Sequence, residues 1–539
     1  MSNHSHHVDG VGRFSMLAQG ALDEVPSDIT VGVRISENDE SPVTFEEAQD
    51  ESGTGTYQIV LLVVCGLVNM SCAISTTAVS FISPAAEIDF DLNSTTKGIL
   101  NGAPFLGMVL GAYFWGVFGD LKGRRLVILG SMGMDTFFTI LSSLVQHVEL
   151  FFILRVGNGF AIIGATCMVY VYLGEFLTPS KRDSYLLFLE LFWALGMLIG
   201  PALAMVIIPS NMVLISTEYF KFNAWRIFIL LTSIPSSISF ILIYQYPDTP
   251  RFLMFRGYII KSREVLEQIY LVNNKFTTVP YPVQVFTQTH SAVWFDTGFI
   301  GGIPFMINVK KRITVLKNGH LTLLSKYFRN IIVACIIEFC IMASYITILV
   351  WVPELFSRYS NYKLQNSDGV NLCTASEWHL KYDKLYAAHA VSGNAYFAAS
   401  VVASSTIPLV LITGIIIKYV DKKKLLFMTC GIPAIFASLV TITHDDLQAE
   451  LLCCLFEGLT SLTEPIIFCT IVELFPSNVR GVAFSMIVMI GRLGAIFGIV
   501  VFGILIDKSC YMTFYGLALL VLIAFIAVSF LPKLKIGGH

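Results

Sequence analysis

Carboxylates and one arginine stand inside long apolar runs of the sequence, where a charged side chain could do chemistry. Glu457 and Glu464 are seven residues apart, which places both on one face of a helix. Glu464 precedes Glu473 by nine residues, about 14 Å of helix rise, so we expect it near the middle of its helix. Arg492 follows Arg480 by twelve residues and is predicted at a similar depth on the next helix.

Two functions for these charges remain open from the residues alone. A charge near the middle of a bilayer costs about 2.5–3.5 kcal/mol, so each one needs a partner or a task. Glu464 and Arg492 either form a structural ion pair, or they line a cavity in which a carboxylate takes a proton and Arg492 holds an anionic solute. Glu338 and Glu190 are further candidates for that cavity, although Glu190 could instead join an arginine network near the helix end.

The elements that position these residues are predicted to be membrane-spanning helices. The chain has 539 residues, of which 55% are hydrophobic and 14% charged. Its repeated apolar runs of roughly 20 residues match a bilayer core about 30 Å thick. Twelve spans are expected, near 57–82, 98–119, 125–146, 149–173, 184–208, 225–246, 329–351, 393–417, 424–443, 449–472, 481–506 and 511–531. Pro465, inside the tenth span, removes a backbone hydrogen bond and frees the carbonyl of Ser461.

The loop charges predict the orientation of these spans. Short loops on one side carry most of the cations, and those on the other side carry only Lys97, Lys221 and Lys508. The positive-inside rule places the cation-rich loops, both termini and the central loop 247–328 in the cytosol. Residues 1–56 are polar and acidic and are expected to form a disordered cytosolic tail, and 532–539 a second tail. Apolar residues at helical spacing predict an amphipathic helix within 262–274.

The opposite side is expected to carry an extended polar loop, 352–392. This loop holds Cys373, and the last turn on the same side holds Cys510. These are the only two of the eleven cysteines that the span prediction places clearly outside, where an oxidising environment would allow them to form a disulfide. The sequence Asn-Ser-Thr at Asn93 falls on this side too, where glycosylation would be permitted.

A polar corner, GVFGDLKGRR, separates the second and third predicted spans. Gly116 would let two helices approach closely, and Gly123 would permit a tight turn. Asp120, Arg124 and Arg125 place three charges at this corner, where they could connect neighbouring helices. The simpler alternative is a capped turn that obeys the positive-inside rule.

Together with other motifs, this corner resembles the major facilitator superfamily. The motifs are RVGNGF (with Arg155), YLGEFLTPSKR (Glu175, Arg182), the Trp225–Arg226 pair, PDTPRFL (Arg251) and VELFPSNVRG (Glu473, Arg480). The resemblance implies a cytosolic gate in which Asp120 faces the start of the eleventh helix across the two halves of the protein. In this gate Arg124 and Arg125 pair with acids on neighbouring helices. The resemblance assigns the same gate Arg124, Arg125, Arg155, Glu175, Arg182, Arg251, Glu473 and Arg480. Asp135 would be structural, because the third helix is usually peripheral in this fold.

The expected fold is all-α, with two pseudo-symmetric six-helix bundles at 57–246 and 329–531. ELFWALG in the fifth span and WVPELFSRY after the seventh look most like the synaptic vesicle glycoprotein 2-like branch. The resemblance implies alternating-access transport of a small polar or charged organic solute, with proton coupling as an option. The rival is a protein of the same fold that only binds partners or nucleotides. No enzyme activity, cofactor, metal or nucleic-acid partner is expected, and we expect a monomer in a plasma or vesicle membrane.

Overall fold

A computed structural model describes residues 44–210, 212–274, 280–283, 317, 321–365, 371–378, 393–416, 420–475 and 477–532. The chain divides into two compact units. One contains residues 1–57 and 249–303, and the other contains residues 58–248 and 304–539. We call the second the membrane unit and describe each unit by itself.

The membrane unit confirms the predicted helices, because twelve of its described helical segments are long and apolar enough to cross a membrane. Six of them form the N-half: α3 (Thr56–Phe90), α4 (Ser94–Lys122), α5 (Arg124–Leu144), α6 (Val148–Glu175), α7 (Pro179–Ile207) and α8 (Ala224–Tyr244). The other six form the C-half: α13 (Phe328–Gln365), α15–α16 (Gly393–Ser404, Thr406–Ile416), α17 (Lys422–Leu439), α18–α19 (Asp446–Ser461, Thr463–Leu474), α20 (Ser477–Leu505) and α21 (Cys510–Ser529).

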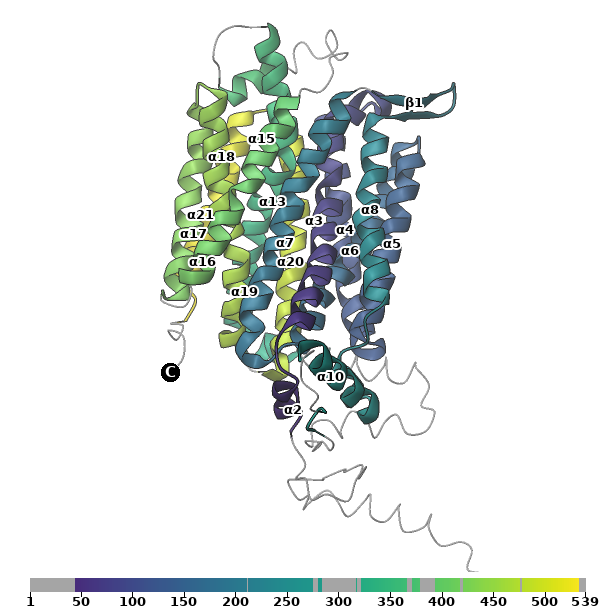
Figure 1. Ribbon diagram of the computed structural model, residues 1–539. Coiled ribbons are helices and arrows are strands. Elements are labelled where there is room, and N and C mark those ends of the chain that lie inside the picture. Colours follow the sequence, from purple (N-terminus) through teal and green to yellow (C-terminus); the bar gives the residue numbers. More distant parts are fainter. Residues whose placement is uncertain are drawn as a thin grey trace, which may run out of the picture. The chain divides into compact units, whose positions relative to one another are not determined.

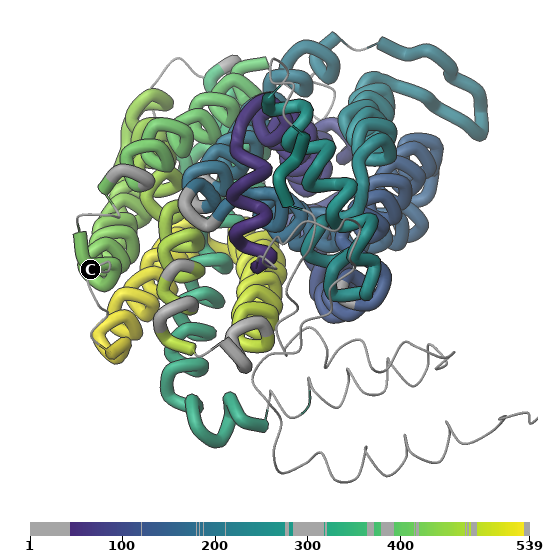
Figure 2. Tube along the Cα trace, turned by 60° about the horizontal axis from the view of Figure 1, so that its bottom comes forward, coloured from purple at the N-terminus to yellow at the C-terminus, as the bar shows by residue number. Residues whose placement is uncertain are grey.

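The two halves lie side by side in the membrane unit (Figure 1), with the N-half in purple to teal and the C-half in green to yellow. They meet along two helix pairs, α4 with α20 and α7 with α15–α16. Figure 2 shows the same two groups of helices in a tilted view. These paired contacts fit the predicted pseudo-symmetry, since each half contributes one helix to each pair.

Within each half, glycines allow close helix packing where the sequence prediction did not place it. A Cβ atom on Gly159 of α6 would lie 1.8 Å from the carbonyl oxygen of Pro104 of α4, so only glycine fits there. Gly116 does not serve this purpose, because a Cβ at that position would meet no atom within 4 Å. The predicted close approach at Gly116 is therefore wrong. Gly123 has φ 107° and ends α4, as the predicted tight turn requires.

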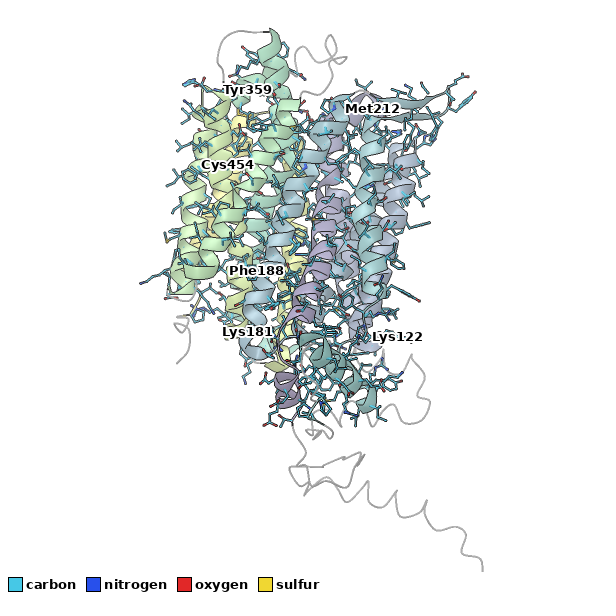
Figure 3. The ribbon with its side chains drawn as sticks, in the orientation of Figure 1. Lys122, Lys181, Phe188, Met212, Tyr359 and Cys454 are labelled. Atoms are coloured by element: carbon cyan, nitrogen blue, oxygen red, sulfur yellow. A yellow bond between two sulfur atoms is a disulfide. The ribbon has the colours of Figure 1, made fainter. Side chains whose placement is uncertain are left out.

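Two names distinguish the ends of the membrane unit. The Gly123 end carries the α4–α5 turn, and the Asn93 end carries the α3–α4 connection. In Figure 3, Lys122 and Lys181 mark the first end, and Met212 and Tyr359 mark the second. Helix α13 continues to Gln365 at the Asn93 end, so the predicted loop 352–392 begins as helix. Asn93 caps α4 by accepting a hydrogen bond from the backbone N–H of Thr96 at 2.9 Å.

A short hairpin projects from the N-half between α7 and α8. Its strands are β1 (Val213–Ser216) and β2 (Lys221–Asn223), which pair antiparallel with an irregularity at Leu214. Both lie in a connection that the sequence analysis left without structure.

The smaller unit contains α2 (Phe45–Glu51), α9 (Pro250–Phe255) and α10 (Ile259–Asn273). Helix α10 is the predicted amphipathic helix, and it buries Val265, Leu266 and Ile269. Helix α2 corrects the expectation that all of 1–56 is disordered, because Thr44 and Glu47 form a capping box there. The hydroxyl of Tyr281 donates to the carbonyl of Ala48 at 2.6 Å, and burial raises the pKa of this phenol.

Candidate functional site

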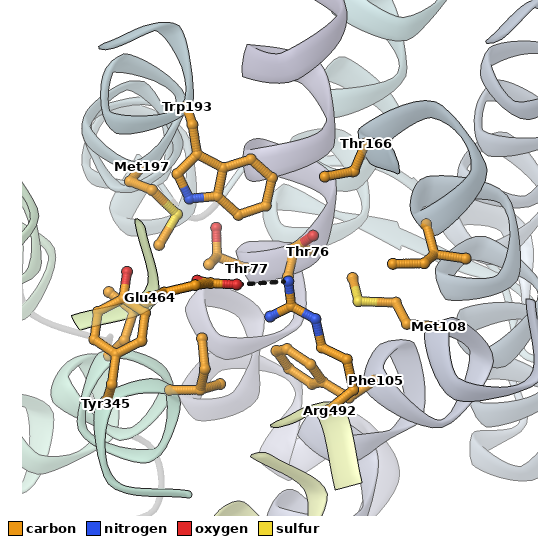
Figure 4. Close-up of a pocket in the computed structure, with 13 residues that line it drawn as sticks. Thr76, Thr77, Phe105, Met108, Thr166, Trp193, Met197, Tyr345, Glu464 and Arg492 are labelled. Carbon is orange, nitrogen blue, oxygen red and sulfur yellow. Dashed lines mark hydrogen bonds and ion pairs between the residues drawn. The ribbon is translucent and has the colours of Figure 1, made fainter. Parts of the chain in front are cut away.

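A small cavity lies between the two halves of the membrane unit. Its walls combine aromatic rings, threonine hydroxyls and one pair of opposite charges (Figure 4). The lining residues are Thr76, Thr77, Phe105, Met108, Ile163, Thr166, Trp193 and Met197 from the N-half, and Tyr345, Ile346, Leu349, Glu464 and Arg492 from the C-half. Apolar walls with a few convergent polar groups are typical of sites for small solutes.

Arg492 and Glu464 form an ion pair and also line the cavity, so both of the arrangements that the sequence left open are present. Nη2 of Arg492 on α20 lies 3.4 Å from Oε1 of Glu464 on α19, and both residues line the cavity. Nη1 of Arg492 contacts Sδ of Met342 at 3.7 Å. The side chains remain 12% and 23% exposed, so a solute could reach both. The pair therefore joins two helices and also faces the space between the halves.

The break between α18 and α19 positions Glu464 in the first turn of a new helix. Helix α18 ends at Ser461 and α19 begins at Thr463, next to Pro465, as the proline predicts. Helix α15 is likewise interrupted before α16, at Ser405, whose hydroxyl donates to the carbonyl of Cys454 on α18 at 3.0 Å. This second interruption was not predicted from the sequence. Broken helices expose backbone groups inside a membrane, which is typical of solute and ion sites in transporters.

Two more carboxylates lie behind the cavity wall. Glu338 of α13 is 1% exposed and Glu457 of α18 is 0% exposed. Among the described residues, Oε2 of Glu338 and both carboxylate oxygens of Glu457 have no hydrogen-bond partner. Glu338 packs against Gly491, where an added Cβ would lie 2.8 Å from its Cγ. Glu338 therefore lies next to the backbone that carries Arg492. We call Glu338, Glu457, Glu464 and Arg492 the cavity cluster.

Glu190 and Asp135 occupy polar environments within the N-half. The carboxylate of Glu190 accepts a hydrogen bond from the hydroxyl of Tyr170, which in turn accepts one from the side-chain amide of Asn69 at 2.9 Å. Glu190 thus contacts a tyrosine, where the sequence alternative was an arginine network. Asp135 is fully buried and accepts hydrogen bonds from Ser75 and Asn158, which fits its expected structural role.

A second charge cluster joins the two halves at the Asn93 end. Nζ of Lys97 on α4 lies 2.7 Å from Glu87 of α3 and 2.7 Å from Glu354 of α13. Lys97 is only 1% exposed, so this cation is buried between two carboxylates. Because Glu354 belongs to the C-half, the contact closes the space between the halves.

Arg358, one turn after Glu354, extends this cluster. Its guanidinium donates to Glu354 at 2.9 Å, Asp507 at 3.2 Å, Ser376 at 3.0 Å and Ser94 at 2.6 Å. The hydroxyl of Ser94 donates to Asp507 at 2.7 Å. We call these residues, with Glu87 and Lys97, the Asn93-end network. A disulfide between Cys373 and Cys510, the pairing that the sequence allowed, lies three residues from both Ser376 and Asp507.

The backbones of the halves also touch at this end. A Cβ added to Gly503 of α20 would lie 2.6 Å from the carbonyl oxygen of Ser94, and one added to Gly98 would lie 3.1 Å from that of Ile499. The hydroxyl of Tyr396 on α15 donates to the carbonyl of Phe81 on α3 at 2.9 Å. The Asn93 end of the membrane unit is therefore closed.

At the Gly123 end, the structure describes only part of the predicted gate. Arg124 pairs with Glu175 of α6 at 3.0 Å. Arg125 donates to the carbonyls of Ile243 and Tyr244, at the end of α8, so the predicted pairing of Arg125 with an acid is wrong. Arg182 donates to the carbonyls of Gly174 and Leu177. The side chains of Asp120, Glu473 and Arg480 lie outside the described ones.

One residue assigned to this gate lies at the other end of the membrane unit, and a second belongs to the smaller unit. Arg155 lies about two turns after the start of α6, toward the Asn93 end, and contacts Ser142 and the ring of Phe151. Its assignment was wrong because α6 runs from the Asn93 end toward Glu175, 20 residues later. Arg251 belongs to the smaller unit, where it lies 3.5 Å from Glu46.

The network residues and the aromatic cavity wall were not predicted from the sequence. Lys97 was noted only as an isolated cation, and Glu354 and Arg358 were placed in a loop because the seventh span was expected to end at 351. Their i, i+4 spacing within WVPELFSRY was the available signal. Trp193 and Tyr345 stand in runs rich in aromatic residues, and no sequence signal separates them from their neighbours.

Comparisons with known proteins agree with this architecture. The family profile described as "Sugar (and other) transporter" matches residues 43–280, and the "Major Facilitator Superfamily" profile matches residues 334–536. Human synaptic vesicle glycoprotein 2B is 29% identical over 346 residues, which cover 61% of this chain and 49% of that protein. Human synaptic vesicle glycoprotein 2A is 33% identical over 258 residues, 48% of this chain and 34% of that protein. The chain thus spans half or less of the curated relatives it matches.

Solved structures of xylose carriers share the fold. A D-xylose-proton symporter superposes with a TM-score of 0.62 at 15% identity, covering 90% of this chain and all of that one. The inward-open xylose transporter XylE from E. coli gives a TM-score of 0.61 at 14% identity, covering 89% and 97%. At these identities the likeness concerns the fold alone.

Proposed function

Since the chain is a member of the major facilitator superfamily, we propose that it moves a small polar or charged organic solute across a membrane by alternating access. The observation that carries this proposal is the cavity between the halves, with Arg492 and Glu464 in its wall and the Asn93 end closed. A solute site that is shut toward one end is what alternating access requires.

The cavity favours a solute that carries an anionic group. Arg492 offers a planar set of donors, and its bond to Glu464 is 3.4 Å long, so a solute carboxylate or phosphate could take up its free donor positions. Trp193, Tyr345 and Phe105 would cover the apolar part of such a solute. Thr76 and Thr77 supply hydroxyls on the opposite wall.

A buried carboxylate could couple this movement to protons. An ionised carboxylate without a partner is costly to bury, and Glu338 and Glu457 have unpartnered oxygens among the described residues. A proton on Glu338 would remove a charge adjacent to Arg492. We therefore assign proton coupling, where it exists, to Glu338, Glu457 or Glu464, with Glu190 as a further candidate.

The orientation is part of the same proposal. Lys122, Arg124, Arg125, Lys181 and Arg182 gather at the Gly123 end, which the positive-inside rule assigns to the cytosol. The cavity would then be closed toward the exterior or a vesicle lumen. The gate at the cytosolic end, with Asp120, Glu473 and Arg480, would close in the alternate state. Asp120→Asn should then leave that gate easier to open, which cysteine labelling of the cavity from the cytosolic side would measure.

Uptake into lipid vesicles containing purified protein tests the function. Anionic and zwitterionic solutes would be screened with and without a pH gradient, comparing the parent with Arg492→Ala and Arg492→Lys. We expect uptake by the parent, none by Arg492→Ala, and weak uptake by Arg492→Lys, which keeps the charge but loses the planar donor set. A folded parent that moves no solute would favour the second candidate, a membrane protein that only binds partners, which the similarity to synaptic vesicle glycoproteins keeps open.

A further inference from the structure

The β1–β2 hairpin presents an unusual surface for a connection between membrane helices. All four residues of β1 are exposed, and three of them are large and apolar: Val213 at 57%, Leu214 at 67% and Ile215 at 49%. Met212 before the strand is exposed as well, and Tyr219 at the tip is 86% exposed. A contiguous exposed apolar patch marks an interaction surface.

The hairpin is held firmly at its base. The side chain of Gln146, in the α5–α6 connection, donates to the carbonyl of Lys221 at 3.1 Å and accepts from its N–H at 3.4 Å. Asn223 donates to Asp89 of α3 at 2.7 Å, and Phe222 is buried. These contacts occupy the β2 side of the hairpin and leave β1 as its outer edge. The apolar residues thus have a fixed direction.

That direction is sideways, away from the C-half. In Figure 1 the hairpin extends beyond α8 and α5 at the level of the helix ends, and Figure 2 shows the same projection in a tilted view. Below it, α5 and α8 carry exposed apolar residues such as Leu144, Ile234 and Ile241, which form the lipid-facing surface of the spans. The hairpin continues this surface at the depth where a bilayer has its headgroups.

We propose that the hairpin is a membrane-surface anchor, whose β1 edge and Tyr219 insert into the boundary between headgroups and acyl chains at the Asn93 end. Aromatic and aliphatic side chains at this depth gain from partial burial while backbone groups stay near water. The unpaired backbone groups along the free edge of β1 stay in the hydrated headgroup region, because hydrocarbon could not satisfy their hydrogen bonds. The anchor fixes the N-half at one level in the membrane, independently of which solute the cavity takes.

Photoactivatable phosphatidylcholines test this in the full chain. One lipid carries a diazirine near the glycerol and the other carries it at the end of an acyl chain, and labelled peptides are identified by mass spectrometry. We expect the shallow lipid to label 212–219 several-fold more than the deep lipid does, and the deep lipid to label the region of Ile234 preferentially. A hairpin labelled by neither lipid, while α8 is labelled, would overturn the proposal. A cross-link between the hairpins of two protein copies, with no lipid adduct on either hairpin, would also overturn the proposal.

Two matched substitutions sharpen the result. Leu214→Asp places a carboxylate on the apolar edge and should reduce shallow labelling of the hairpin several-fold, leaving α8 labelling unchanged. Ser216→Asp adds the same charge to the same strand, opposite Lys221, and should keep the labelling. Equal loss in both variants, or in neither, would contradict an apolar anchor. Retained labelling of α8 shows that each variant is folded and inserted.

Discussion

The membrane unit contains two buried charge clusters, and they differ in how completely their charges are partnered. In the Asn93-end network, Lys97 contacts two carboxylates, and Arg358 contacts two carboxylates and two hydroxyls. In the cavity cluster, Arg492 contacts Glu464, and Glu338 and Glu457 keep oxygens without a partner among the described residues. Partnered charges hold helices together, whereas unpartnered ones are available to a solute or a proton. The first cluster holds the Asn93 end closed, and the second supplies the charges at the cavity between the halves.

The largest effect is expected for Lys97→Met. This change removes the buried cation that contacts both Glu87 and Glu354, while Glu354 keeps its contact with Arg358, and the loss should cost roughly 3–5 kcal/mol. Thermal unfolding of the purified protein measures the loss. The matched control is Lys363→Met on the same helix as Glu354, because Lys363 pairs with Asp446 but is 61% exposed. That variant should lose less than about 1 kcal/mol of unfolding free energy. Equal losses in the two variants would contradict the special contribution of the buried Lys97 to stability.

Glutamate-to-glutamine changes compare the clusters directly. Glu354→Gln removes the carboxylate shared by Lys97 and Arg358 and should destabilise the protein by about 2–4 kcal/mol. Glu338→Gln removes a charge that has an unpartnered oxygen, so stability should change by less than about 1 kcal/mol. If Glu338 carries the coupling proton, stimulation of uptake by a pH gradient should disappear in this variant while exchange of solute at equal pH persists. Strong destabilisation by Glu338→Gln would contradict the comparison.

The Arg492–Glu464 pair is expected to lie between these extremes. Each single alanine variant leaves a partly exposed charge without its partner and should cost roughly 2–3 kcal/mol. The double variant should regain most of the folding stability and remain unable to transport. Recovery of both stability and uptake would reduce the pair to a structural role, and single variants that behave like the parent would show that neither charge needs the other.

The smallest effect concerns which side the Asn93 end faces. Asn93→Asp keeps the oxygen that caps α4 and removes the glycosylation sequence, whereas Asn93→Ala removes both and should cost about 0.5–2 kcal/mol. Expression in glycosylating cells should give a glycosidase-sensitive mass shift in the parent and in neither variant. If the parent shows no mass shift, the assignment of the Asn93 end to the exterior would rest on the loop charges alone.

Much of the fold followed from the sequence because span length and apolar composition are local properties. The similar depth of Glu464 and Arg492 along their helices could also be predicted from the sequence, because helix rise per residue is constant. The structure brings these two residues together. The Asn93-end network was not readable, because Lys97 and Glu354 are 257 residues apart and their pairing depends on how the halves meet. The roles of Gly116 and Arg155 were assigned by resemblance, and the packing around each contradicts the assignment.

The contact between Gly503 and Ser94 has a further consequence for the cycle of the protein. The spacing of α4 and α20 is set there by the absence of a side chain, since an added Cβ would overlap a backbone carbonyl at 2.6 Å. A single methyl group at this position of α20 would therefore hold α4 and α20 apart, and the attraction between the nearby charges could not bring them together. The glycine makes the sealed conformation sterically accessible, and the ion pairs beside it then decide how long the seal lasts.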